Sequence, residues 1–231
     1  KVWSKLSQAN NNYNLGKVKG LCDEFADIFA LEEDTVSVNN FYEQKLRLTD
    51  NSPVYIKNYR LPYFHKKEIN KQVDKMLKSG IIEHSRSAYN SPVILVPKKS
   101  INGERKWRMC IDFRLINKKL IPDKFPLPRV DDILDNLGRA KYFSVLDLFS
   151  GFHQVKLHPD SRNITSFSTD QGSFQYTVLP FGLNVAPNSF QRMMSIAFSG
   201  LSPSSCFLYL DDLIVLGSSE NHHLKNLKEV F

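Results

Sequence analysis

The chain has 231 residues, of which 42% are hydrophobic and 24% are charged, and its net charge is +7. This length and composition are typical of a globular protein with one or two subdomains. Three scattered cysteines argue against structural zinc and for a reducing compartment. No apolar stretch reaches the length of a membrane span. No signal peptide is recognisable, and because the first residue is Lys, we expect a piece of a longer protein.

The positive charge is concentrated in one segment. Residues 86–129 hold eleven Lys and Arg against three acids, so this segment carries +8 and the rest of the chain −1. Trp107, Phe113 and Phe125 are interleaved with these cations. The combination favours a surface that faces a polyanion, such as nucleic acid or a nucleotide, over a merely solvated face.

The first half of the chain predicts two helices and a hairpin. Apolar residues at helical spacing predict a short helix near 20–30, within a region (1–50) that is otherwise typical of a linker. A stronger amphipathic helix is predicted over 65–79, with Gly80 as its stop. Strands at 93–96 and 107–113, joined through Asn102-Gly103, predict a hairpin with one apolar face. Arg108 and Asp112 share its polar face, where a structural salt bridge is the simplest interpretation.

The second half predicts more strands than helices. A helix over 129–137 precedes a strand at 142–146, which delivers Asp147 at its end, and Ser150-Gly151 then turns the chain. Three short strands are expected at 155–157, 164–167 and 174–178, followed by a helix from Pro187 and a last helix from Glu220. Since strands and helices do not strictly alternate, we expect an α+β fold in which an antiparallel sheet is covered by helices mainly on one face.

A second hairpin is predicted between the apolar runs 206–208 and 213–216, with Asp211 and Asp212 at its tip. One interpretation is an ordinary surface turn. The other is a metal site, because an antiparallel sheet can place Asp147 beside this tip. Three carboxylates at one sheet edge repel one another unless cations neutralise them. Two Mg²⁺ ions about 3.5–4 Å apart are the usual solution in phosphoryl transfer.

Four sequence blocks then occur in a characteristic order. They are WRMCIDFRLIN at 107–117, VLDLFSGFHQ at 145–154, LPFGLNVAPNSFQRM at 179–193 and YLDDLIV at 209–215. Over roughly residues 20–231 the chain resembles reverse transcriptases, in particular that region of the Pol polyprotein of Gypsy/Ty3-type LTR retrotransposons. The resemblance implies a right-hand polymerase fold, with an upstream linker at 1–50, fingers at 51–121 and 155–185, and palm at 122–154 and 186–231.

The resemblance also implies the site residues. Asp147, Asp211 and Asp212 match the catalytic triad that holds two Mg²⁺ ions, for which Mn²⁺ can substitute. The residues that match deoxynucleotide contacts are Lys98, Arg108, Leu148, Phe152, Phe181 and Gly182; the ring of Phe152 would collide with a 2′-hydroxyl. Those assigned to nucleic acid are Arg105, Lys106, Arg114 and Tyr209. Gln191 and Arg192 are interpreted as structural. The order Leu183–Pro187 and the residue Phe149 depart from the family pattern around the nucleotide pocket.

The implied activity is RNA-directed DNA synthesis, a nucleotidyl transfer from a dNTP to a primer 3′-hydroxyl on an RNA or DNA template. The implied partners are the rest of Pol (protease, thumb, RNase H and integrase), with no membrane. The implied location is a cytoplasmic virus-like particle, with a nuclear stage as a further location. The six histidines have no ligand-like spacing, so surface or capping roles are expected.

Two other functions fit part of the pattern. A truncated or decayed element product that only binds nucleic acid requires no more than the basic segment 86–129. A viral RNA replicase would also use a palm, but Phe152 and the block LPFG argue against it.

Overall fold

The computed structural model describes residues 15–31, 34–98, 106–126, 129, 131, 135, 137–138, 140–201, 205–209 and 212–231. The chain divides into two compact units. Unit 1 comprises 1–35, 125–149 and 191–231, and unit 2 comprises 36–124 and 150–190. The turn predicted at Asn102-Gly103, most of the helix predicted over 129–137, and the candidate residues Arg105 and Asp211 lie outside the described residues.

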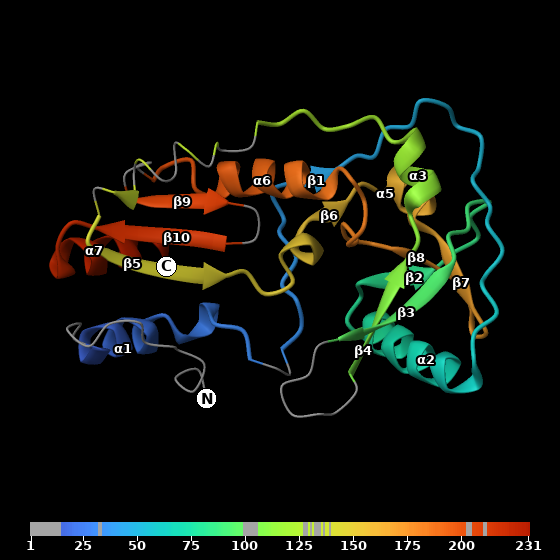
Figure 1. Cartoon of the computed structure of the whole chain (residues 1–231), viewed down its shortest axis with the longest axis horizontal. Coiled ribbons are helices and arrows are strands. Elements are labelled where there is room, and N and C mark those ends of the chain that lie inside the picture. Colours follow the sequence, from blue (N-terminus) through green and yellow to red (C-terminus); the bar gives the residue numbers. More distant parts are fainter. Residues whose placement is uncertain are drawn as a thin grey trace. The chain divides into compact units, whose positions relative to one another are not determined.

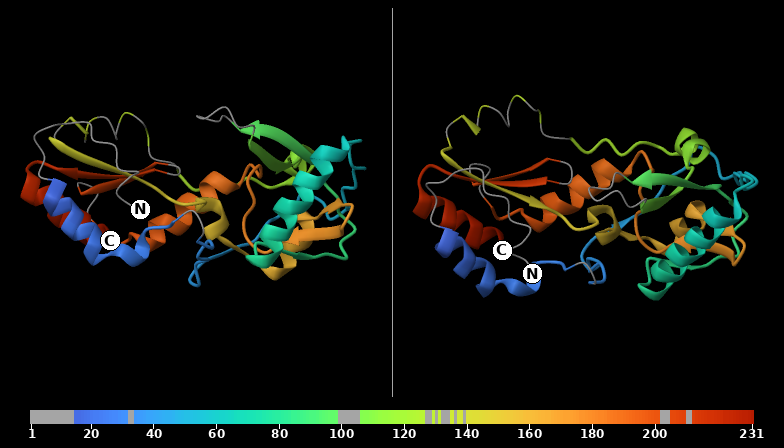
Figure 2. Two further views of the ribbon diagram at one scale, coloured as in Figure 1. Left: turned by 90° about the horizontal axis from the view of Figure 1, so that it is seen from below. Right: turned by 60° about the horizontal axis from the view of Figure 1, so that its bottom comes forward.

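Unit 1 is built on a three-stranded antiparallel sheet (Figure 1). Its order is β5 (Tyr142–Asp147), β10 (Asp212–Gly217) and β9 (Cys206–Tyr209). Helices α1 (Leu15–Glu24) and α7 (Glu220–Val230) lie side by side against one face of it (Figure 2). The core there is formed by Leu21, Val215 and Leu227. Because successive side chains of a strand point to opposite faces, burial of one set leaves the other set on the uncovered face.

Helix α7 is fixed to β10 at its start. The Ser219 side chain caps the helix by accepting a hydrogen bond from the His222 backbone N–H at 3.3 Å. Asn226 donates from Nδ2 to the Leu216 carbonyl at 2.7 Å. A Cβ on Gly217 would lie 2.4 Å from the Cβ of His223, so only glycine permits this close approach.

Unit 2 contains a hairpin and a small sheet. The hairpin pairs β3 (Val93–Lys98) with β4 (Lys106–Ile111), and the sheet has the order β2 (Ile82–His84), β8 (Gly172–Tyr176) and β7 (Phe167–Thr169). A further pair, β1 (Glu43–Gln44) and β6 (Lys156–Leu157), is parallel. Helix α2 (Tyr63–Lys78) buries Ile69 and Val73, as its apolar stripe predicts. Gln72 of α2 contacts β4 twice, since it donates to the Trp107 carbonyl at 3.1 Å and accepts from the Met109 N–H at 3.0 Å.

Helical segments connect these strands. They are η2 (Ala26–Ile28), α3 (Arg114–Lys119), η3 (Gly151–Gln154), α5 (Pro159–Arg162), η4 (Asn163–Thr165) and α6 (Ala186–Ala197). Two predictions were wrong in detail, and one helix was not predicted. The helix expected near 20–30 begins at Leu15, α3 was not expected, and the strand expected at 164–167 is replaced by η4 until Phe167. There Thr165 donates to the Arg162 carbonyl at 2.7 Å and accepts from the Tyr176 N–H at 2.9 Å, which holds a helical turn against β8.

The mixture of helices and antiparallel sheets confirms the predicted α+β class. Within the described part of the chain, no helix combines the length and the apolar character needed to cross a bilayer.

Candidate active site

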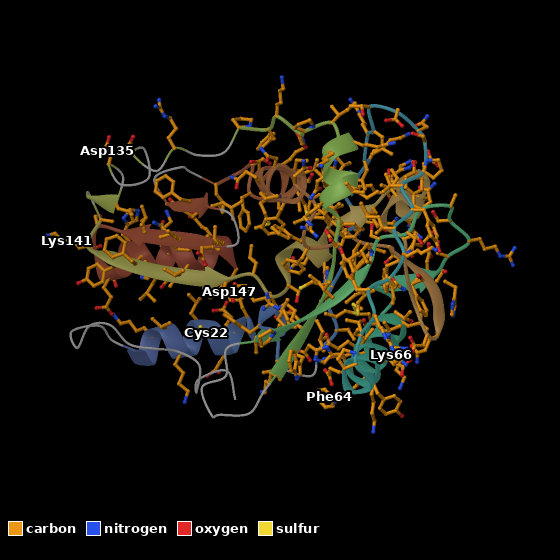
Figure 3. The ribbon with its side chains drawn as sticks, turned by 45° about the vertical axis from the view of Figure 1, so that its right-hand side comes forward. Cys22, Phe64, Lys66, Asp135, Lys141 and Asp147 are labelled. Carbon is orange, nitrogen blue, oxygen red and sulfur yellow. The ribbon has the colours of Figure 1, made fainter. Side chains whose placement is uncertain are left out.

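Two carboxylates face each other at the end of the sheet of unit 1. In the antiparallel register of β5 and β10, Asp212 is the partner of Asp147. Directly opposed residues have Cβ atoms about 4.5–5.5 Å apart and project from the same face of the sheet. Both carboxylates are exposed, and Figure 3 shows Asp147 at the end of its strand. The predicted approach of Asp147 to the hairpin is therefore present in the structure, although 64 residues separate it from Asp211 along the chain.

The hairpin itself differs by one residue from the prediction. Strand β9 ends at Tyr209 and β10 begins at Asp212, and these two residues are paired. Asp212 therefore belongs to a strand rather than to the tip. This register fixes the direction of the Asp212 side chain by the alternation of the strand.

The carboxylates lie on the face of the sheet opposite to α1 and α7. Along β5, Phe143, Val145 and Asp147 are exposed, whereas the residues between them are half-buried. Leu146 packs against the core of α1 and α7, so Asp147 must point the other way. Oxygen ligands of this kind suit Mg²⁺ and other hard divalent cations. The described residues contain no group of three or more His, Cys, Asp or Glu side chains placed to hold a metal, and Asp211 is not among the residues searched.

Phe152 lies in an aromatic cluster of unit 2. Its ring centroid is 5.0 Å from that of Phe181 and 5.6 Å from that of Phe190. Gly151 permits this packing, because a Cβ there would lie 2.9 Å from Cζ of Phe190. Ser150 adopts the left-handed conformation (φ 50°), which makes the predicted turn. The ring of Phe152 is thus held between two others.

Asn117 fixes the loop that carries Phe181 and Gly182. Its Nδ2 donates to the Gly182 carbonyl at 2.8 Å, and its Oδ1 accepts from the Asn184 N–H at 2.9 Å. Asn184 returns a bond from Nδ2 to the Asn117 carbonyl at 3.2 Å. Gly182 has φ 93°, which favours glycine. No role was predicted for Asn117, although its place at the end of the first sequence block was a usable signal.

The β3–β4 hairpin presents three cations on one face. Lys98 is the partner of Lys106, and Arg108 is the partner of Val96. By the alternation of the strands, all three cationic side chains point to the same side. Each of them is exposed. The sequence placed Lys98 and Arg108 in one role and Lys106 in another, whereas the hairpin displays them as a single positive surface.

Asp112 pairs with Arg114 rather than with Arg108. The guanidinium of Arg114 donates to both carboxylate oxygens, at 2.8 and 2.6 Å, and Tyr59 Oη donates to Oδ2 at 3.0 Å. These bonds, that from Arg114 first, lower the pKa of Asp112 to about 2. Because Asp112 follows the end of β4, its carboxylate lies within reach of the next turn. The Arg114 side chain remains 81% exposed.

One histidine is buried and another is half-buried, contrary to expectation. His153 packs edge-on against Phe181 with ring centroids 5.0 Å apart, and burial lowers its pKa to about 4. His223 is 1% exposed, and burial lowers its pKa too. By contrast, His158 has the capping role expected of such residues, since it accepts from the Asp160 N–H. Spacing rules for metal ligands could not reveal burial, because the packing partner Phe181 is distant in sequence.

Arg192 and Gln191 fit the structural interpretation given to them. The guanidinium of Arg192 lies 4.7 Å from the ring centroid of Phe125, a cation–π contact. Gln191 is 5% exposed. The side chain of Tyr209 and the whole of Arg105 lie outside what the structure describes. Leu148, which follows β5, is half-buried.

Comparison with known proteins places the chain in a family. Residues 96–231, more than half of the chain, match the family described as "Reverse transcriptase (RNA-dependent DNA polymerase)". The chain belongs to this reverse transcriptase family.

Its relatives come from transposons, which confirms the resemblance given above. The chain is 61% identical over 231 residues to the retrovirus-related Pol polyprotein from transposon 412 of Drosophila melanogaster, covering 98% of this chain and 19% of the relative. It is 38% identical over 204 residues to that from transposon gypsy of the same organism, covering 87% and 20%. The chain thus spans about a fifth of the length of these curated relatives.

Solved structures of foamy viral protease–reverse transcriptase share the fold. The foamy viral protein in complex with an RNA/DNA hybrid matches with a TM-score of 0.80 and 26% identity. The match covers 95% of the present chain and 29% of the foamy viral chain. A crystal structure of the prototype foamy virus protein has a TM-score of 0.84 and 25% identity, covering 99% and 30%. These matches confirm the predicted polymerase fold.

Proposed function

We propose that the chain is the fingers and palm part of an RNA-directed DNA polymerase, which joins a dNTP to the 3′-hydroxyl of a primer. The observation that carries the proposal is the register that sets Asp212 opposite Asp147 at an exposed sheet end. Two like charges at this distance are unfavourable alone and become favourable around a divalent cation.

Asp147, Asp211 and Asp212 would hold two Mg²⁺ ions, or Mn²⁺ in their place. When bound, such ions supply activation of the attacking hydroxyl and neutralisation of the leaving pyrophosphate. The chain contributes the orientation of the ligands. Strand pairing on both sides of β10 fixes Asp147 and Asp212. Their carboxylates would therefore already be in position before a metal ion binds.

Other residues would select and hold the nucleotide. Lys98 and Arg108 would contact the triphosphate, and Arg108 can bind phosphate bidentately. The ring of Phe152 would lie under the sugar and exclude a 2′-hydroxyl, and its packing against Phe181 supports this assignment. Gly182 and Leu148 would each contact the nucleotide as well. Lys106, Arg105, Arg114 and Tyr209 would contact template or primer.

The two units would correspond to the two named subdomains. Unit 1 would be the palm, proposed at 122–154 and 186–231, and unit 2 the fingers, proposed at 51–121 and 155–185. The boundaries of the compact units at 124/125, 149/150 and 190/191 lie three to five residues from the proposed ones, whereas unit 1 also includes 1–35 and unit 2 begins at 36 rather than 51. RNA or DNA with a primer, dNTPs and the remainder of a Pol polyprotein would be the partners.

Primer extension tests the proposal. The Pol product that contains this chain and a thumb should extend a primer on an RNA template with dNTPs and Mg²⁺. Asp211→Asn should abolish extension while leaving primer–template binding intact, because the lost carboxylate is a metal ligand rather than a nucleic-acid contact. Undiminished extension by Asp211→Asn would refute the site assignment. Salt-sensitive binding with no incorporation under any condition would support the function of nucleic-acid binding alone.

A further inference from the structure

His153 contacts one of the proposed nucleotide residues without being one itself. It directly follows Phe152 in η3, and its ring lies edge-to-face with that of Phe181, with centroids 5.0 Å apart and planes at 73°. The sequence predicted only a surface or capping role for this histidine. In the structure it is half-buried, and burial lowers its pKa to about 4. The imidazole is therefore neutral near pH 7 and packs as an aromatic ring rather than as a cation.

The side chain of Phe181 depends on neighbouring rings for its orientation. Phe181 is 49% exposed, and its backbone is held at the next residue, where Asn117 donates to the Gly182 carbonyl. A fixed backbone still leaves an exposed side chain a choice of rotamers. Two rings restrict that choice, since the centroids of Phe152 and His153 each lie 5.0 Å from that of Phe181. Consecutive residues of a 3₁₀ helix point about 120° apart, so these rings hold Phe181 from different directions.

Each of the two supporting rings is itself backed by a buried ring. The centroid of the first lies 5.6 Å from that of Phe190, which is 0% exposed, and the centroid of the second lies 6.2 Å from that of Tyr176, which is 6% exposed. The end of η3 is anchored as well, because the carbonyl of Gln154 accepts from the N–H and from Nδ2 of Asn39, at 2.9 and 2.7 Å. All of these residues belong to unit 2. Phe181 is therefore the exposed member of an otherwise rigid group of rings.

We propose that His153 is a positioning residue for sugar selection, which it exerts through Phe181. The proposed function excludes a 2′-hydroxyl by a collision with the ring of Phe152, and a collision discriminates only if the ring cannot move away. Phe181 restricts that movement because the two phenylalanine rings are in contact, and His153 holds Phe181 in place. This inference rests on the proposed function, because it requires a nucleotide at Phe152, and it adds a residue that acts on the nucleotide only through its neighbour.

Replacement of the flat ring should relax the choice of sugar. His153→Leu fills a similar volume, so packing is largely kept, but the edge-to-face contact with Phe181 is lost. Phe181 can then adopt other rotamers, and the ring of Phe152 can yield to a 2′-hydroxyl. The ratio of kcat/KM for a dNTP to that for the matching rNTP should fall about tenfold. His153→Phe keeps a ring at the same place and should keep the ratio of the unchanged protein.

Single-nucleotide extension measures this ratio. The Pol product that contains this chain and a thumb is given a primer–template with either the dNTP or the matching rNTP, and kcat and KM are measured for each. His84→Leu is the matched control, because His84 of β2 also packs on a phenylalanine ring of unit 2, with its centroid 5.1 Å from that of Phe174. It should leave the ratio unchanged. A thermal melt of each variant reports on folding.

A second variant removes the same contact from its exposed side. Phe181→Leu should lower the ratio as His153→Leu does, and because Phe181 is half exposed, this variant tests the proposal even if His153→Leu fails to fold.

Several results would overturn the proposal. Equal losses of kcat/KM for both nucleotides in His153→Leu would show that His153 has only a structural role. An unchanged ratio in either leucine variant of the contact would do the same. A lowered ratio in His153→Phe would show that an imidazole nitrogen acts rather than the ring. A lowered ratio in His84→Leu would show a general effect of ring packing. Absence of incorporation by the unchanged Pol product with either nucleotide would instead overturn the proposed function.

Discussion

At the scale of single residues, strand pairing brings the like charges of Asp147 and Asp212 together, which is electrostatically unfavourable. The two residues are distant in sequence, and only the register of β5 with β10 brings their carboxylates together. The covered face of the same sheet buries Val215, so a slip of one residue would move the apolar side chains out of the core. Core packing therefore enforces the position of the carboxylates.

His153 provides a test of burial at this scale. Its pKa in the folded chain is about 4, below the ordinary value of about 6.5. The unfolded chain therefore binds the proton first, and stability is lost as the pH falls from about 6.5 towards 4. His153→Phe should remove this part of the pH dependence, which amounts to roughly 3 kcal/mol at most. Urea unfolding at pH 7 and pH 4.5 measures the difference.

The comparison isolates His153 because the other groups with lowered pKa values either titrate at lower pH or contribute equally to both proteins. Asp112, with a pKa of about 2, loses its contribution only at lower pH. His223 also has a lowered pKa, but it is present in both proteins. Identical pH profiles of the two proteins would show that His153 is not shielded from water by its packing against Phe181.

At the scale of elements, hydrogen bonds with α3 hold the loop 182–184 in place, although this loop is not part of a helix or a sheet. Asn117 supplies one donor and one acceptor to the loop backbone, as a neighbouring strand would. The loop can therefore place Phe181 beside Phe152 without belonging to a sheet. Neither α3 nor this interaction could be predicted from periodicity, because α3 has six residues and only Ile116 buried.

Asn117→Asp tests this attachment. Aspartate keeps an acceptor for the Asn184 N–H but replaces the donor to Gly182 by an oxygen, so the two oxygens oppose each other. We expect a loss of about 1 kcal/mol in the free energy of unfolding and faster amide hydrogen exchange at 182–184. Asn184→Ala removes only one bond to the Asn117 carbonyl and should have a smaller effect. Equal exchange rates in all three proteins would contradict the role of Asn117.

At the scale of the whole molecule, the sequence predicted what depends on order and periodicity. Apolar residues at helical spacing located α2 and α6, an apolar run located β3, and alternation located β4, because each pattern is local. The four sequence blocks identified the family. Periodicity could not supply features that depend on the three-dimensional placement of side chains: the pairing of Asp112 with Arg114, the partial burial of His153, and the 3₁₀ turn that replaces a strand at Asn163.

The central claim is that Asp147 and Asp212, with Asp211, hold divalent cations. Isothermal titration with Mn²⁺ in the absence of nucleic acid measures this directly, using the unchanged chain, Asp147→Asn and the control Asp170→Asn, whose carboxylate belongs to unit 2. The account predicts that Asp147→Asn weakens Mn²⁺ binding by more than about tenfold and that Asp170→Asn leaves it unchanged. Equal binding by the unchanged chain and Asp147→Asn would contradict it.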